Sequence, residues 1–200
     1  MNKEQLDSWM KKTYQLIHEH KEELSELDQV VGDGDHGVNM DRGFKAVVDG
    51  LAEWGEESVS ATLQKIGTTL VSKVGGASGP LFGTAFMRMS IAFKEDDHAW
   101  RDGLEKATDG IAKRGKASPG DGTLLDVFDP VAKSVAEHGV DWSEMETVAK
   151  QGMEQTKEFV VKRGRGALLE ERSVGHLDPG AVSSYYLFHA LAIVMKGAET

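Results

Sequence analysis

The sequence predicts an all-α fold. Apolar residues recur at helical spacing through most of the 200-residue chain, and no run between turn signals shows the alternation of a β-strand. The segments between these stretches are short and rich in glycine. Because no linker is long enough to separate two domains, we expect residues 1–200 to form one domain of consecutive antiparallel helices.

The N-terminal half is expected to contain four helices. One apolar stripe starts at Leu6, and another starts at Leu63. Between these two stripes, a helix is expected to follow an acidic turn and to begin near His36. Pro80 suits the first turn of a fourth helix, because a proline there gives up no helical hydrogen bond. These helices are expected over residues 3–24, 36–52, 58–74 and 80–93.

Four more helices are expected in the C-terminal half. The glycine-rich stretch 114–122 separates the first two of them. Ser143 with Glu146 predicts a capping box for the third. Asp178 followed by Pro179 predicts an N-cap and a first-turn proline for the last. These helices are expected over residues 99–114, 123–137, 143–161 and 179–196, so the chain is predicted to hold eight amphipathic helices in total.

The composition limits the function. There are 23 Lys and Arg against 33 Asp and Glu, which gives a formal net charge of -10. Such a surface repels nucleic acid and anionic membranes, so neither is expected as a partner. The chain has no cysteine, no secretory apolar segment near the N-terminus and no run of 18 apolar residues. A cytoplasmic protein is therefore expected.

Glycine is concentrated in the predicted loops. A helix C-cap needs one glycine, whereas the stretch GGASGPLFG contains four. Loops of this kind are typical of sites where a ligand approaches the backbone closely. The glycine-rich stretches cover residues 32–37, 75–83, 114–122, 162–166 and 176–180.

Three familiar motifs do not apply to these loops. GDGDHG, residues 32–37, matches the dinucleotide pattern G-x-G-x-x-G, but that motif needs a preceding strand and a parallel sheet. An EF-hand loop starting at Asp33 would place Val38 and Phe44 where glycine and glutamate are required. GGASGPLFGT lacks the Gly-Lys-Ser/Thr ending of a Walker A loop.

The carboxylates of the first loop indicate a different chemistry. Asp28, Asp33 and Asp35 lie at positions i, i+5 and i+7, with small residues among them. Three carboxylates can converge on one point only if a cation offsets their repulsion, and oxygen ligands alone select Mg²⁺ or Ca²⁺. The alternative is an exposed acidic turn in which Asp35 caps a helix, and the residues alone leave both interpretations open.

The GGASG loop is a candidate anion site. Ala77, Ser78 and Gly79 can present backbone N–H groups where a helix begins, and the dipole of that helix favours an anion. The alternative is a junction of small residues that serves helix packing.

Several segments together resemble one family. The stretches LDQVVGDGDHGVNM, VGGASGPLFGTAF, KRGKASPGDGTLLDV and KRGRGALLEERSVGHLDPGA resemble, in this order, the motifs of the nucleotide-binding L subunit of dihydroxyacetone kinase. The similarity runs from about Leu27 to the C-terminal helix. The resemblance implies an eight-helix antiparallel barrel whose nucleotide site lies in the loops at one end.

The resemblance also implies the ligands and the residues that bind them. The cofactors would be ADP or ATP with Mg²⁺, and the metal ligands would be Asp28, Asp33 and Asp35. Arg165 would be the catalytic residue, as a partner for the terminal phosphate. Nucleotide binding would involve His36, Gly37, Val38, Asn39, Ala77, Ser78, Gly115, Leu124, Arg165, Asp178, Pro179 and Gly180.

The partners implied are protein subunits. In the family, a K subunit holds dihydroxyacetone, the L subunit keeps ADP as a cofactor, and an M subunit of the phosphotransferase system re-phosphorylates it. Two alternatives stay open: an ATP-exchanging kinase domain for another substrate such as a fatty acid, and a nucleotide-bound partner of a transcriptional regulator. This chain departs from the family pattern at Gly122, where a lysine is usual, and at Ala167 and Leu168, where serine and tyrosine are usual.

Overall fold

The predicted all-α class is confirmed. The computed structural model describes residues 1–55 and 57–198, with only the backbone described at Arg165. Over these residues the chain forms nine α-helices and two 3₁₀ helices, and no strand. The α-helices are α1 Lys3–Glu19, α2 Lys21–Val31, α3 His36–Trp54, α4 Val59–Lys73, α5 Ser78–Ala92, α6 Trp100–Gly115, α7 Leu125–His138, α8 Trp142–Gln155 and α9 Pro179–Gly197. The 3₁₀ helices are η1 Thr156–Glu158 and η2 Arg165–Ser173.

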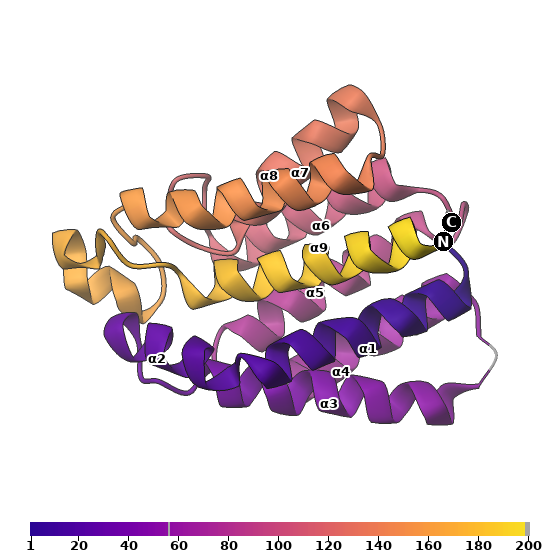
Figure 1. Ribbon diagram of the computed structural model, residues 1–200, viewed down its shortest axis with the longest axis horizontal. Helices are drawn as coiled ribbons and strands as arrows, with labels where there is room; N and C mark the ends of the chain where they lie inside the picture. Colours follow the sequence, from indigo (N-terminus) through magenta and orange to yellow (C-terminus); the bar gives the residue numbers. More distant parts are fainter. Residues whose placement is uncertain (56, 199–200) are drawn as a thin grey trace.

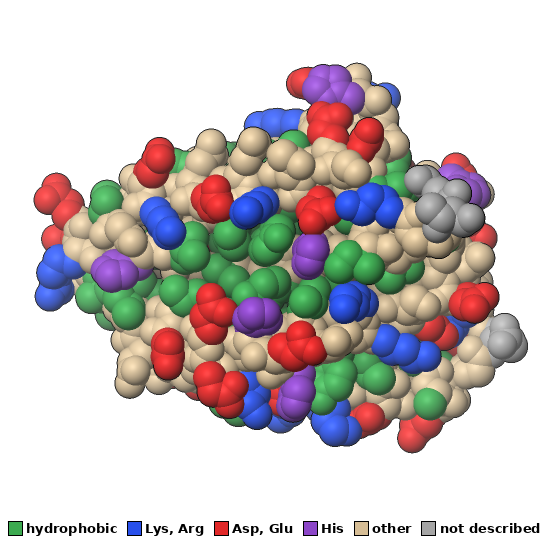
Figure 2. Space-filling view, viewed as in Figure 1, with side chains coloured by type: hydrophobic (Ala, Val, Ile, Leu, Met, Phe, Trp, Pro, Cys, Tyr) green, Lys and Arg blue, Asp and Glu red, His purple; other side chains and the backbone are tan. Residues whose placement is uncertain are grey.

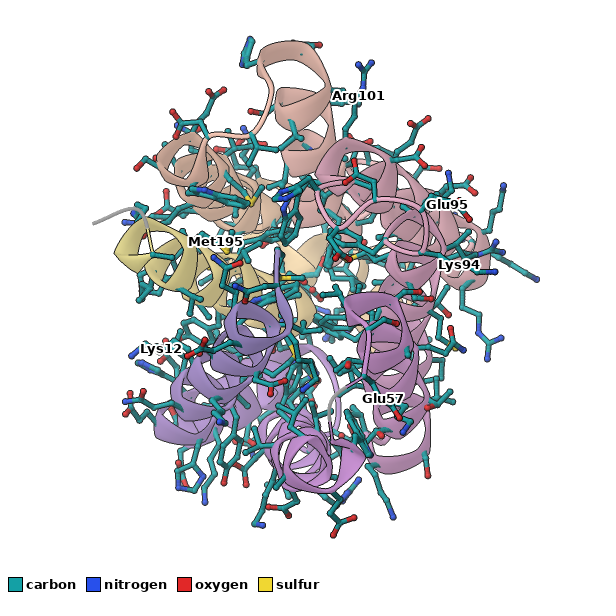
Figure 3. The ribbon with its side chains drawn as sticks, turned by 90° about the vertical axis from the view of Figure 1, so that its right-hand side faces the viewer. Lys12, Glu57, Lys94, Glu95, Arg101 and Met195 are labelled. Carbon is teal, nitrogen blue, oxygen red and sulfur yellow. The ribbon has the colours of Figure 1, made fainter. Side chains whose placement is uncertain are left out.

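The helices form a closed ring. From α3 to α9 each packs against the next one along the chain, α1 packs against α3, and α9 packs against α1. Figure 1 shows α9 lying between α8 and α1, where it closes the ring. Seen along the ring in Figure 3, side chains fill the centre, while Lys94 and Arg101 point outward. This is the arrangement that the predicted barrel requires.

The closing helix α9 is buried around most of its circumference. Phe188 and Leu191 are about 1% exposed or less, and the Trp9 indole Nε1 of α1 donates a 2.8 Å hydrogen bond to the Leu187 carbonyl. Figure 2 shows apolar side chains along the band occupied by α9, flanked by charged side chains of its neighbours. No helix in the described part of the chain is both long and apolar enough to span a membrane.

The first predicted helix, 3–24, is two helices in the structure. The chain breaks at His20, and α2 then continues to Val31 before the acidic turn. Asp28 therefore lies in the last turns of a helix, which corrects the expectation that it belongs to the loop. The break lets α2 lie directly on the start of α3. Gly37 permits this contact, because a Cβ there would overlap the carbonyl oxygen of Lys21.

Two helix starts test the predicted caps. The Ser143 capping box was wrong: α8 begins one residue earlier, and the Asp141 carboxylate caps it by accepting from the amides of Ser143 and Glu144. The cap of the last helix was right, since the Asp178 carboxylate accepts a 2.7 Å hydrogen bond from the Ala181 amide. The predicted helix 143–161 also ends earlier, at Gln155.

The connections alternate between the two ends of the ring. Glycine-rich connections follow α2, α4, α6 and α8, and they gather at one end, which we call the glycine end. The connections after α3, α5 and α7 lie at the other end, together with both chain termini (Figure 1). We call this the terminal end. The antiparallel order therefore brings together four loops that are far apart in the sequence.

Candidate functional site

A cavity of about 530 Å³ opens at the glycine end. This volume is typical of small-molecule sites. Its wall is formed by the ends of α2 and α6, the starts of α3, α5, α7 and α9, and the loops between them. The predicted site residues on this wall are Asp28, Asp33, Asp35, His36, Asn39, Ala77, Ser78, Gly115, Leu124, Asp178, Pro179 and Gly180.

Three predicted residues are not brought to this wall by the described structure. Gly37 is buried in the contact between α2 and α3. Val38 is 56% exposed and borders a shallow hollow on the outer side of those helices. The Arg165 side chain lies outside the described residues, so its predicted role is carried forward as a proposal.

The three aspartates converge at the mouth of the cavity. One carboxylate oxygen from each of Asp28, Asp33 and Asp35 lies within 4.8 Å of the other two. The Asp28 Oδ2 atom also accepts hydrogen bonds from the amides of Asp35, at 3.0 Å, and His36, at 3.2 Å. Asp28 thus shapes the turn that carries the other two carboxylates. The cluster offers only oxygen donors and is exposed on one side, which fits a hard divalent cation that keeps water or phosphate ligands.

The charge of the cavity wall favours a bound cation as well. Besides the three clustered carboxylates, Asp178 lines the cavity, whereas Arg114 and Arg163 are the cationic side chains described there. The guanidinium of Arg163 is already paired, because its Nε donates to the Asp121 carboxylate at 3.0 Å. A polyphosphate would therefore meet excess negative charge unless a divalent cation came with it.

His36 is held inside the wall by two hydroxyl groups. Its side chain is 7% exposed; Nε2 lies 2.8 Å from the Ser183 Oγ, and Nδ1 lies 3.2 Å from the Ser78 Oγ. Burial lowers the pKa of His36 to about 4, so the ring is neutral at physiological pH. Sequence reasoning found His36 and Ser78 but missed Ser183, which sits in an apolar helix with no motif around it.

The start of α5 has no cap of its own. Ala77, in the N-cap position, makes no side-chain hydrogen bond to the helix. A Cβ on Gly79 would overlap the Val74 carbonyl oxygen, and a Cβ on Gly75 would lie 2.8 Å from the Asn39 amide group. The small residues of this loop are therefore required for packing, and they also leave the first turn of α5 open to an anion.

Two further carboxylates organise the loop between α6 and α7, and sequence reasoning missed both. Asp126 accepts hydrogen bonds from the amides of Gly120, at 2.5 Å, and Thr123, at 2.7 Å, and burial raises its pKa. Asp121 accepts from the Ser118 amide at 3.0 Å. The sequence does not single out either residue, and their burial distinguishes them.

Asp178 combines a structural and an electrostatic role. It caps α9, and burial, followed by the charges of Asp126 and Asp28, raises its pKa to about 7. An aspartate with a raised pKa in a cavity is typical of functional sites. The cavity thus joins a cluster suited to Mg²⁺, an uncapped helix start and a carboxyl group with a raised pKa, which together suit a metal-bound anion.

Comparison with known proteins agrees with this class of site. The sequence profile of the DAK2 domain matches residues 30–193, and the chain belongs to this family. It is 41% identical over 186 residues to the "PEP-dependent dihydroxyacetone kinase 1, ADP-binding subunit DhaL" of Listeria innocua, covering 92% of each chain. It is 36% identical over 211 residues to the corresponding ADP-binding subunit of Escherichia coli, covering 98% of this chain and 99% of that one.

A solved structure has the same fold. The dihydroxyacetone kinase of C. freundii, solved in complex with AMP-PNP and Mg²⁺, superimposes with a TM-score of 0.78 at 22% identity. The match covers 94% of this chain but 33% of that one, so this chain spans about a third of the longer kinase. At this identity the likeness is one of fold.

Proposed function

We propose that this protein is the ADP-binding subunit of a phosphoenolpyruvate-dependent dihydroxyacetone kinase, with residues 1–200 acting as one domain in the cytoplasm. The observation that carries the proposal is the convergence of Asp28, Asp33 and Asp35 beside the uncapped start of α5 in one cavity. Phosphoryl transfer needs charge neutralisation and alignment of phosphates more than covalent help from the protein, and this cavity supplies groups for both.

Each part of the wall has a proposed role. Asp28, Asp33 and Asp35 hold Mg²⁺, which neutralises phosphate charge when it is bound. Ala77 and Ser78 offer backbone and hydroxyl donors to the phosphates. The remaining predicted contacts close the site around the nucleotide; they are His36, Asn39, Gly115, Leu124, Asp178, Pro179 and Gly180. Arg165 is proposed to pair with the terminal phosphate.

The acceptor is proposed to lie on another protein. A general base must reach the hydroxyl proton that it removes. Among the described wall residues, His36 is the one histidine, and both its ring nitrogens are occupied by serine hydroxyls. The Asp178 carboxylate is already engaged as the cap of α9. We therefore infer that a K subunit binds and activates dihydroxyacetone, that an M subunit of the phosphotransferase system restores the nucleotide, and that a transcriptional regulator can be a further partner.

The test is the Mg²⁺-dependent retention of nucleotide. The purified protein is denatured, and the nucleotide released is identified and quantified; close to one ADP per chain is expected. Replacing one proposed metal ligand, Asp33→Asn, should lower ADP affinity in Mg²⁺ by at least about 100-fold, because losing a group that only hydrogen-bonds to a metal ligand already costs about 10–100-fold in metal affinity.

The matched control is Asp49→Asn, which removes an exposed carboxylate that pairs with Lys45 on the outside of α3. It should bind ADP like the wild type. A D33N variant that copurifies with a full complement of ADP would refute the assignment of the metal site. A wild-type protein that supports no dihydroxyacetone phosphorylation with K and M subunits would refute the function.

A further inference from the structure

Three side chains form a hydrogen-bonded chain across the cavity wall. Ser78 at the start of α5, His36 at the start of α3 and Ser183 in α9 are linked by contacts of 3.2 Å and 2.8 Å. Ser183 is fully buried and His36 nearly so, whereas Ser78 reaches the cavity. The chain thus connects a residue deep in the core to a hydroxyl group that faces the ligand.

The direction of these hydrogen bonds decides what Ser78 can do. A neutral imidazole donates from one nitrogen and accepts at the other. If the proton is on Nδ1, His36 donates to the Ser78 oxygen, and the Ser78 proton stays free for an anion. If the proton is on Nε2, Ser78 must donate its own proton to Nδ1, and it then turns lone pairs toward the cavity.

The Ser183 hydroxyl decides between these two directions. Ser183 is fully buried, and among the described residues His36 Nε2 is the partner of its hydroxyl, so the hydroxyl proton has Nε2 as its acceptor. With Ser183 donating, Nε2 becomes the acceptor and the ring proton resides on Nδ1.

We propose that Ser183 is a positioning residue: by donating to His36 Nε2 it keeps the ring proton on Nδ1, and so holds the Ser78 hydroxyl as a hydrogen-bond donor to the nucleotide phosphates. The inference rests on the proposed function for the identity of the anion. The direction of the hydrogen bonds, however, can be measured without any ligand.

The first experiment is ¹⁵N NMR of the ligand-free protein with labelled histidines. His36→Gln identifies the His36 signals by their loss. The wild type should show the Nδ1–H tautomer, and Ser183→Ala should shift the signals toward Nε2–H. The matched control is Ser184→Ala, which removes a fully buried neighbour whose hydroxyl bonds to the Gly180 carbonyl within α9, at 2.9 Å. It should leave the tautomer unchanged.

The second experiment is a double-mutant cycle read out by Mg²⁺·ADP affinity. Ser183→Ala and Ser78→Ala should each weaken binding about tenfold, the size of one hydrogen bond to a charged group. Because both act through the same hydroxyl, the double variant should be no more than about twofold weaker than Ser78→Ala. Ser184→Ala should bind like the wild type.

Distinct results would overturn the inference. An Nε2–H ring in the wild type, once His36→Gln has assigned the signals, refutes it directly. If the affinity losses of Ser183→Ala and Ser78→Ala add up in the double variant, the two residues act independently. If Ser184→Ala loses as much affinity as Ser183→Ala, Ser183 contributes only to the packing of α9. Either result refutes the inference. If the wild type binds no Mg²⁺·ADP, the proposed function fails, while the NMR measurement still decides the role of Ser183.

Discussion

The helices that begin at the two ends of the ring start differently. At the terminal end, three of the four helix starts are capped by their own N-cap side chains, which are Asn2, Ser58 and Asp141. At the glycine end, three of the four helices that follow a loop have N-cap residues that make no such bond, which are Asp35, Ala77 and Leu124. A further helix, α2, continues α1 after the break at His20 and is also uncapped. Both ends belong to the same ring and carry similar helices, so the difference is local.

We infer that this difference in capping reflects two uses of the helix starts. The capped starts at the terminal end contribute to stability, whereas the uncapped starts at the glycine end keep backbone N–H groups for a ligand. The first N–H groups of any helix lack helical partners and must be satisfied by a cap, water or a ligand. At the terminal end side chains do this. At the glycine end the start of α3 is held by Asp28, whose carboxylate also belongs to the cluster of three aspartates, and the start of α5 faces the cavity. Phosphate is the ligand that such a helix start favours.

The largest effect should come from placing a charge at the uncapped start of α5. Ala77→Asp puts a carboxylate on the cavity wall beside the proposed phosphate position. Juxtaposed like charges cost several kcal/mol, so ADP affinity should fall by about 100-fold or more. Isothermal titration with Mg²⁺·ADP measures the loss, and Ala77→Ser, which adds no charge, is the control. Equal affinities for A77D and the wild type would show that no anion binds at this helix start.

At the terminal end, removing a cap is expected to lower stability and to leave ADP affinity unchanged. Asp141→Ala removes the carboxylate that accepts from the Ser143 and Glu144 amides at the start of α8. The free energy of unfolding should fall by about 1 kcal/mol, as for other N-caps. ADP affinity should not change, because the cap lies at the opposite end from the cavity. Denaturant unfolding and ADP titration of the same variant check both parts, and a loss of ADP affinity would break the proposed separation.

The smallest effect should be on the pH dependence of thermal stability, through the surface pair of His138 and Glu144 at the terminal end. His138 Nδ1 lies 2.6 Å from the Glu144 carboxylate, whose hydrogen bond and charge raise the pKa of the histidine above 6.5. The stabilisation is complete below pH 6.5 and is lost as the pH rises through the raised folded-state pKa. His138→Gln should therefore lower the Tm more at pH 6 than at pH 9. Thermal scans across this range test it, with His98→Gln as the control.

Much of the fold follows from the sequence because helical periodicity is a local property. Seven of the eight expected helices correspond to single helices of the structure, and the cap at Asp178 was recognised from its proline neighbour. The break at His20 could not be predicted, since apolar residues continue at helical spacing beyond it. It depends on α2 packing against the glycine at position 37, a contact between separate helices.

Sequence reasoning found only some of the candidate site residues, because it detects local patterns and not contacts between distant segments. The aspartates and the glycine loop carry their signal in their own spacing, and they line the cavity as expected. Ser183 has no local signal, because its importance comes from burial and from a partner far away in the chain. Asp121 and Asp126 lie within the stretch KRGKASPGDGTLLDV, but only their burial marks them as organising residues. Gly122, where the family usually has lysine, has φ of +69° and would bring a Cβ within 3.2 Å of Val161, so the local backbone suits glycine.

By itself, the sequence determined the all-α class, the glycine-rich connections and the set of carboxylates suited to Mg²⁺, because each depends on residues close together in the chain. Only the tertiary structure decided that alternate connections meet at one end, that Asp28 reaches the other two aspartates from a helix, and that a buried serine of α9 contacts the histidine behind the GGASG loop. These relations depend on how the ring closes, and closure is a property of all the helices packed together.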